Sequence, residues 1–211
     1  MEKFSQLLED IIFSPSTNKK TDLLEKYFKE INMLEKGSAL EILSSNHNLK
    51  SLRISDLKNL IYSRLDKTLF ELSYDYVGDL AETISLIWRS KKNSKTKKLP
   101  LLSEFLCYCR EKPKDDVYNY TISLLDISNA TQRWTIIKIL FGGLRIGVSD
   151  QILKKALSRY GDKELKKIEK IWHGLTPPYQ NLFEWLDNKK PEPIVDVFNI
   201  FHPMMLSNPI N

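Results

Sequence analysis

Apolar side chains recur along most of the chain with the period of an α-helix. From Phe4 to Ile12 they occupy positions i, i+3, i+4, i+7 and i+8, which share one helical face. A second stripe runs from Leu23 to Ile31 after a Ser-Pro-Ser-Thr-Asn break, with Asn18 as its expected N-cap. Further helical stretches are expected at Ala39–Leu43, Leu57–Leu65, Val77–Trp88, Leu101–Cys109, Val117–Leu125, Trp134–Phe141, Ile152–Tyr160, Leu165–Trp172 and Tyr179–Leu186.

The same pattern gives little support for a β-sheet. Valine occurs only five times, and strict alternation of polar and apolar residues is nearly absent. The sequence therefore predicts an all-α fold, a single domain of about ten to twelve helices over residues 1–188. A short echo links Arg53–Leu65 and Arg145–Tyr160, each with Arg-Ile, Ser-Asp and then an apolar helix; it is short enough to arise by chance, and two related helical halves would also produce it.

The composition changes after residue 188. Four prolines fall in the last 21 residues, where no helical period is visible. Residues 189–211 are therefore expected to form an extended, Pro-rich C-terminal tail or linker.

The overall charge is moderately basic. A net charge of +5 is compatible with a polyanionic partner without requiring one. The chain has no apolar run of membrane-spanning length, and its acidic start differs from the basic start of a signal peptide. A cytoplasmic protein with no membrane partner is expected.

Neither metal binding nor catalysis is expected from the residue pattern. Cys107 and Cys109 lie in an apolar helical run, so both are expected to be reduced and at least one to be in the core. No zinc-type ligand spacing surrounds the single histidines, which are His47, His173 and His202.

Carboxylates also gather at Asp75, Asp79 and Glu82, with helical spacing but no histidine or basic partner. We interpret Asp79 as a cap or a pairing group within the fold. The neighbouring residues expected in the core are Tyr74, Tyr76, Leu80 and Ile84.

The stretch FGGLRIGVSD, residues 141–150, is the most distinctive in the chain. Gly142 and Gly143 are suited to closing the preceding helix, and Gly147 to letting the backbone approach a ligand closely. Ser149 is the expected cap of the next helix, whose first amides favour an anion beside the Arg145 guanidinium. The predicted phosphate-contacting positions are Gly143, Arg145, Gly147 and Ser149, supported from the flanking helices by Arg133, Lys138, Lys154, Lys155 and Arg159.

One alternative to a phosphate-contacting turn is excluded by the sequence, and another stays open. The stretch lacks the lysine of a P-loop and no strand precedes it, so a nucleotide-binding loop is excluded. A tight turn between packed helices, with an exposed arginine, explains the glycines without any ligand, and the glycine pattern alone favours it over a phosphate site.

A basic run without a carboxylate extends from Arg89 to Lys98. It is either a solvated connector or an arm that contacts a nucleic-acid backbone. The lysines assigned to such an arm are Lys91, Lys92, Lys95, Lys97 and Lys98.

Several long segments, in order, resemble one protein family. They are STNKKTDLLEKYF, LFELSYDYVGDLAETISLIW, LLDISNATQRWTIIKILFGGLRIGVSDQILKKAL, IEKIWHGLTPPYQNLFEWL and FHPMML. Together they resemble the N-terminal DNA-binding domain of ATP-dependent DNA ligases, especially bacterial ones. The resemblance implies a helical domain of two related halves that lies on the minor-groove side of nicked duplex DNA, with the GGLRIG stretch on its backbone-contacting surface.

The catalytic features of that family are missing. Its members join nicks through an adenylated lysine in a K-x-D-G motif, which this sequence lacks. The resemblance thus implies sequence-nonspecific DNA binding in repair, recombination and replication, without catalytic residues, and with ATP and Mg²⁺ expected only in a full-length ligase. The implied partners are nicked double-stranded DNA and a separate nucleotidyltransferase and OB-fold core, and the implied location is the nucleoid. A monomer is expected. The alternative to DNA binding is a helical protein-interaction scaffold, which would be half of a split ligase or an inactive remnant.

Overall fold

Twelve α-helices and no β-strand occur in the residues that the computed structural model describes, which are 1–45, 49, 52–90, 98–141 and 144–195. This confirms the all-α prediction for those ranges. The helices are α1 (Glu2–Ile12), α2 (Thr17–Glu30), α3 (Met33–Leu43), α4 (Ile54–Tyr62), α5 (Lys67–Val77), α6 (Leu80–Ile87), α7 (Leu102–Glu111), α8 (Lys114–Ile127), α9 (Ala130–Phe141), α10 (Asp150–Gly161), α11 (Leu165–Trp172) and α12 (Gln180–Leu186).

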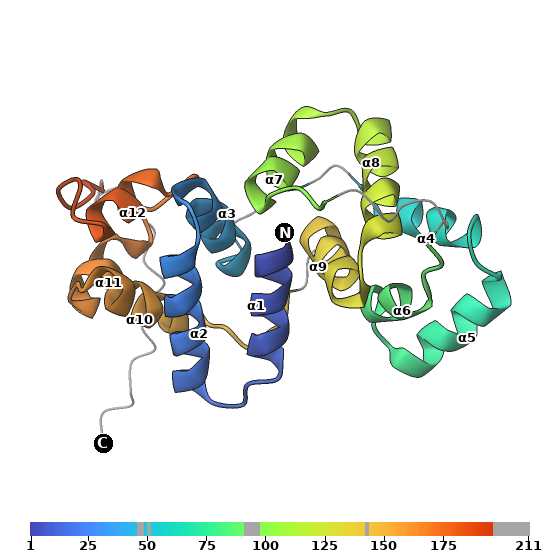
Figure 1. Ribbon diagram of the computed structural model, residues 1–211, viewed down its shortest axis with the longest axis horizontal. Helices are drawn as coiled ribbons and strands as arrows, with labels where there is room; N and C mark the ends of the chain where they lie inside the picture. Colours follow the sequence, from blue (N-terminus) through green and yellow to red (C-terminus); the bar gives the residue numbers. More distant parts are fainter. Residues whose placement is uncertain (46–48, 50–51, 91–97, 142–143, 196–211) are drawn as a thin grey trace, which may run out of the picture.

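The helices form two lobes (Figure 1). One lobe contains α1–α3 and α10–α12, in which α2 packs along α10 and α3 packs on α12. The other contains α4–α9, with α6 packed on both α5 and α9. The chain therefore leaves the first lobe after α3 and returns to it between α9 and α10, through the glycine-containing stretch.

Side-chain caps set several helix starts. Asn32, Asp66 and Asp79 each accept a hydrogen bond from the backbone amide three residues later, at 2.9 Å. The prediction of Asn18 as the cap of α2 is wrong, because Ser16 occupies that position and accepts from the Lys19 amide.

The helix expected over Val77–Trp88 starts later than its apolar pattern indicates, and a helix that was not expected precedes it. Gly78 has φ of 74°, a left-handed conformation that ends α5, and Asp79 then caps α6. The helix expected over Val77–Trp88 is therefore confirmed as α6, which begins three residues later and ends one residue earlier, whereas the apolar pattern did not indicate α5. The region still provides core residues such as Ile84, but Tyr76 is 92% exposed, which overturns its assignment to the core.

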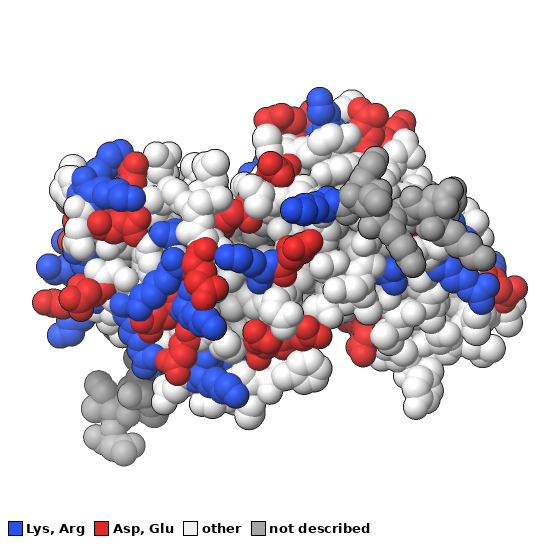
Figure 2. All heavy atoms as spheres, viewed as in Figure 1, with Lys and Arg blue, Asp and Glu red and all other residues white. Residues whose placement is uncertain are grey.

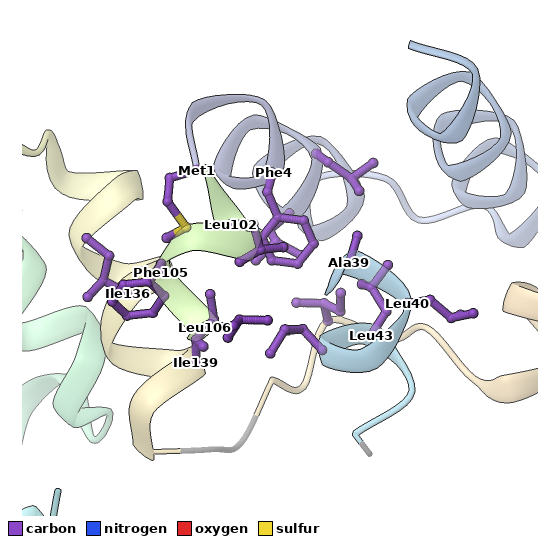
Figure 3. Packing of buried hydrophobic residues seen from close by; sticks show 14 of the residues in the cluster. Met1, Phe4, Ala39, Leu40, Leu43, Leu102, Phe105, Leu106, Ile136 and Ile139 are labelled. Carbon is purple, nitrogen blue, oxygen red and sulfur yellow. The ribbon is translucent and has the colours of Figure 1, made fainter. Parts of the chain in front are cut away.

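Apolar packing joins the two lobes. Figure 3 shows side chains of α1, α3, α7 and α9 pointing toward one another, among them Phe4, Leu40, Phe105 and Ile139. Each of these four is fully buried. As predicted for at least one cysteine, Cys109 is buried, whereas Cys107 is exposed. The described helices thus share one apolar core rather than two.

The two segments with echoed sequence start their helices differently. Arg53 is the N-cap of α4, whereas Ser149, four residues after Arg145, is the N-cap of α10. The shared Arg-Ile and Ser-Asp pairs therefore occupy different positions relative to the start of each helix.

A buried carboxylate reinforces the contact between the lobes. Glu35 of α3 accepts hydrogen bonds from the first two amides of α7, Leu102 at 3.0 Å and Ser103 at 2.7 Å. These amides have no partner inside their own helix, and a negative charge at a helix N-terminus is favourable. Glu35 therefore caps α7 from the opposite lobe.

We expect Glu35→Ala to lower the free energy of unfolding by about 1–3 kcal/mol, because the buried Leu102 amide and the partly buried Ser103 amide lose their acceptor. Glu25→Ala is the control, since it removes only an exposed pair with Lys29 on α2, at 2.7 Å, and is expected to cost less than about 0.5 kcal/mol. Urea unfolding followed by circular dichroism measures both. Equal effects would contradict a special role for Glu35.

Candidate nucleic-acid interface

The connection between α9 and α10 alternates between buried and exposed residues. Ile146 is buried in the apolar core, while Arg145 and Gly147 on either side of it are exposed. Gly147 has φ of 66°, in the left-handed region that glycine adopts without strain. The buried isoleucine therefore anchors the connection and leaves the Arg145 guanidinium at the surface.

Lys20 holds this connection from α2. Its Nζ donates to the carbonyl oxygens of Ile146 at 2.9 Å and Gly147 at 3.2 Å. Sequence reasoning from the glycine stretch missed this residue, because the two partners lie more than 120 positions away. Among the described residues, neither Lys20 nor Arg145 forms an ion pair with a carboxylate. Two cations without a carboxylate partner therefore lie at one short segment, Arg145 exposed and Lys20 partly buried against the two carbonyls.

Ser149 is the N-cap of α10, as predicted, but its side chain makes no capping hydrogen bond. The first helical residue is Asp150, whose Oδ2 accepts from Trp172 Nε1 at 3.0 Å. This carboxylate already complements the positive end of the helix. A phosphate would therefore be attracted mainly by Arg145 and Lys20, and less by the α10 amides than the sequence pattern indicates.

Lys154 lies one turn further along α10. Its Nζ is 5.3 Å from the centroid of the Trp172 ring, which also donates to Asp150. Lys154 is partly buried on this ring, whereas Lys155 beside it is exposed. Of these two lysines on α10, only Lys155 is therefore fully exposed to a ligand.

Arg133 is committed to the interior of the second lobe. Its guanidinium donates to the carbonyl oxygens of Leu125 at 2.9 Å and Ser85 at 3.4 Å, and to Ser90 Oγ at 2.7 Å. Burial lowers its pKa, against the opposing charge of Asp126. These bonds fasten the ends of α6 and α8 to α9, so the charge of Arg133 is used within the fold.

Lys138, also on α9, pairs with Asp79. Nζ lies 2.6 Å from Asp79 Oδ2, and the lysine side chain is only 15% exposed. Partial burial raises the pKa of Asp79, but the hydrogen bonds from Lys138 and the α6 amides outweigh it and hold that pKa below its usual range. The prediction that Asp79 caps and pairs within the fold is confirmed.

The structure thus gathers only part of the predicted set. Arg145, Gly147 and Ser149 share one connection, with Lys154 nearby on α10, while Arg133 and Lys138 use their charges internally. Lys98 is exposed. Five predicted positions lie outside the described residues: Gly143, Lys91, Lys92, Lys95 and Lys97.

The described part of the chain contains neither a metal-binding cluster nor a membrane-spanning helix. Those residues contain no group of three or more histidine, cysteine or acidic side chains placed to hold a metal ion. No helix among them is long and apolar enough to cross a membrane. In comparisons with known proteins, no family model and no curated sequence matches the chain.

Gly147 and Lys20 are coupled sterically. A Cβ on Gly147 would stand 2.7 Å from Lys20 Nζ. Gly147→Ala is expected to destabilise by about 1–2 kcal/mol for the left-handed φ, and by about 1 kcal/mol more for displacing the Lys20 hydrogen bonds. Urea unfolding provides the measurement.

Gly78→Ala is the matched control, with φ of 74° and nothing within 4 Å of the added Cβ. In a Lys20→Ala background, the cost of Gly147→Ala is expected to fall to that of Gly78→Ala. A cost of Gly147→Ala that is independent of Lys20 would refute the coupling.

Proposed function

We propose that this chain binds duplex DNA along the sugar-phosphate backbone without reading sequence, as the N-terminal domain of an ATP-dependent DNA ligase. The observation that carries the proposal is Arg145, an exposed guanidinium on a connection anchored by Ile146 and held by Lys20. The anchored backbone determines where the side chain emerges, and the planar guanidinium suits a two-point contact with a phosphate.

The surroundings of the connection support a polyanionic partner. Lys19 and Lys155 are exposed on α2 and α10, the two helices that pack together beside it. Figure 2 shows Lys and Arg side chains spread over the lobe that contains α2, interspersed with carboxylates. This mixture favours moderate, salt-sensitive affinity over very tight binding.

The sequence resemblance gives the proposal its biological setting. A nick-binding domain acts in repair, recombination and replication by holding the duplex while a nucleotidyltransferase and OB-fold core joins the ends. That core is the proposed protein partner, and the nucleoid the proposed location. ATP and Mg²⁺ would serve the core, because the adenylated lysine of a K-x-D-G motif has no counterpart in this sequence.

Binding of labelled nicked duplex, followed by fluorescence anisotropy at several salt concentrations, tests the proposal. Affinity is expected to fall linearly with salt on logarithmic axes, equally for unrelated sequences. Arg145→Ala is expected to reduce the slope by about one and to weaken all sequences alike.

Lys112→Ala is the charge-matched control, since it removes one exposed cation between α7 and α8. It is expected to leave the slope unchanged. Absence of salt-dependent binding by the unmodified chain would refute the proposed function, whereas an unchanged slope in Arg145→Ala alone would remove only Arg145 from the site.

A further inference from the structure

A groove lies over the first half of α9, between the end of α1 and helix α6. Its volume is about 450 Å³, and its lining includes Ala130 and Trp134 of α9 and Leu86 of α6. Helix α9 packs on both α1 and α6, and Figure 1 shows α9 between them. The three helices therefore leave a channel with a helix on each side and a helix as its floor.

The walls of this channel are apolar and exposed. Phe13 at the end of α1 is 80% exposed, Leu86 is 63% exposed, and Ile12 adds a third large hydrophobic side chain. Exposed apolar side chains that line one concave surface are typical of an interaction site, whereas single scattered ones are not.

The polar rim is acidic, although the whole chain is basic. Asp79 is paired with Lys138, at 2.6 Å, so these two lining charges offset each other. Glu9 and the exposed Glu82 remain, with Arg145 as the other lining cation. Within the described ranges, Glu9 accepts from two uncharged donors, Thr131 Oγ1 at 3.0 Å and Gln6 Nε2 at 3.3 Å, and from no cation. The two unpaired carboxylates therefore favour a cationic partner.

We propose that this groove binds an amphipathic helix of another protein, with apolar side chains on one face and lysines or arginines flanking them. Ala130 and Trp134 stand one turn apart on the floor, and an amphipathic helix presents its apolar anchors at the same one-turn spacing. The apolar anchors contact Phe13, Leu86 and Trp134, and the basic side chains face Glu9 and Glu82.

Other occupants fit the groove less well. DNA would bring phosphates against Glu9 and Glu82, which costs electrostatic energy. A second copy of the chain, in a two-fold contact through this groove, would bring the same carboxylates together from both copies. The proposal does not depend on the DNA-binding function, because only Arg145 belongs to both regions.

The test uses two designed, fluorescein-labelled helical peptides of about 18 residues, roughly five turns. Both carry leucines on one face, and the flanking positions are lysine in one peptide and glutamate in the other. In anisotropy titrations of the whole chain, we expect the lysine peptide to bind at least about tenfold more tightly than the glutamate peptide. Leu86→Ser is expected to weaken it by about tenfold, and Glu82→Gln to reduce its salt dependence.

Leu72→Ser is the matched control, because Leu72 is 65% exposed on α5 and is not part of the groove lining. It is expected to leave peptide binding unchanged, and Leu86→Ser is expected to leave DNA affinity unchanged. Equal effects of the two serine variants on the peptide would overturn the proposal.

Two further results would also overturn it by assigning the groove to another occupant. One is self-association in sedimentation velocity that Leu86→Ser abolishes. The other is loss of DNA binding in Leu86→Ser without loss of peptide binding. The Arg145→Ala and Lys112→Ala comparison tests DNA binding separately.

Discussion

Burial of apolar side chains between the lobes is the constraint on which the remaining structure depends. Helices α1 and α3 of one lobe pack on α9 and α7 of the other, and their side chains form one cluster. Because the chain crosses between lobes through the connection after α9, this packing fixes both ends of that connection. The position of Arg145 is thus a consequence of helix packing and not of the glycines alone.

Two charged side chains bind backbone groups that lie far away along the chain. Glu35 caps α7 across the boundary, and Lys20 accommodates two carbonyls of the returning chain. A buried amide or carbonyl without a partner is costly, so these long-range bonds stabilise one arrangement of the lobes over others. None of these bonds involves the Arg145 side chain, which stays exposed to solvent.

Two surfaces with different chemistry follow from this arrangement. The cations of Lys20 and Arg145 lie at the returning connection, whereas the groove over α9 is apolar with an acidic rim. Arg145 lies where the two regions meet. A nucleic-acid backbone suits the first region and a basic helix the second, so the proposed DNA-binding and protein-binding roles can coexist on one chain.

The helical period alone determined the all-α class and most helix positions, because amphipathic stripes and polar caps act over a few neighbouring residues. It also located the α9–α10 connection and the internal role of Asp79. Only the tertiary structure decided which cations remain available to bind a phosphate. In the sequence, Arg133 and Lys138 are basic residues near the glycine stretch, just as Arg145 is. In the fold, both are bound by groups from distant segments, Arg133 by Ser85 and Ser90 and Lys138 by Asp79. The tertiary structure also introduced Lys20 and the groove between α1 and α6, because contacts between distant segments depend on helix packing that local spacing does not encode.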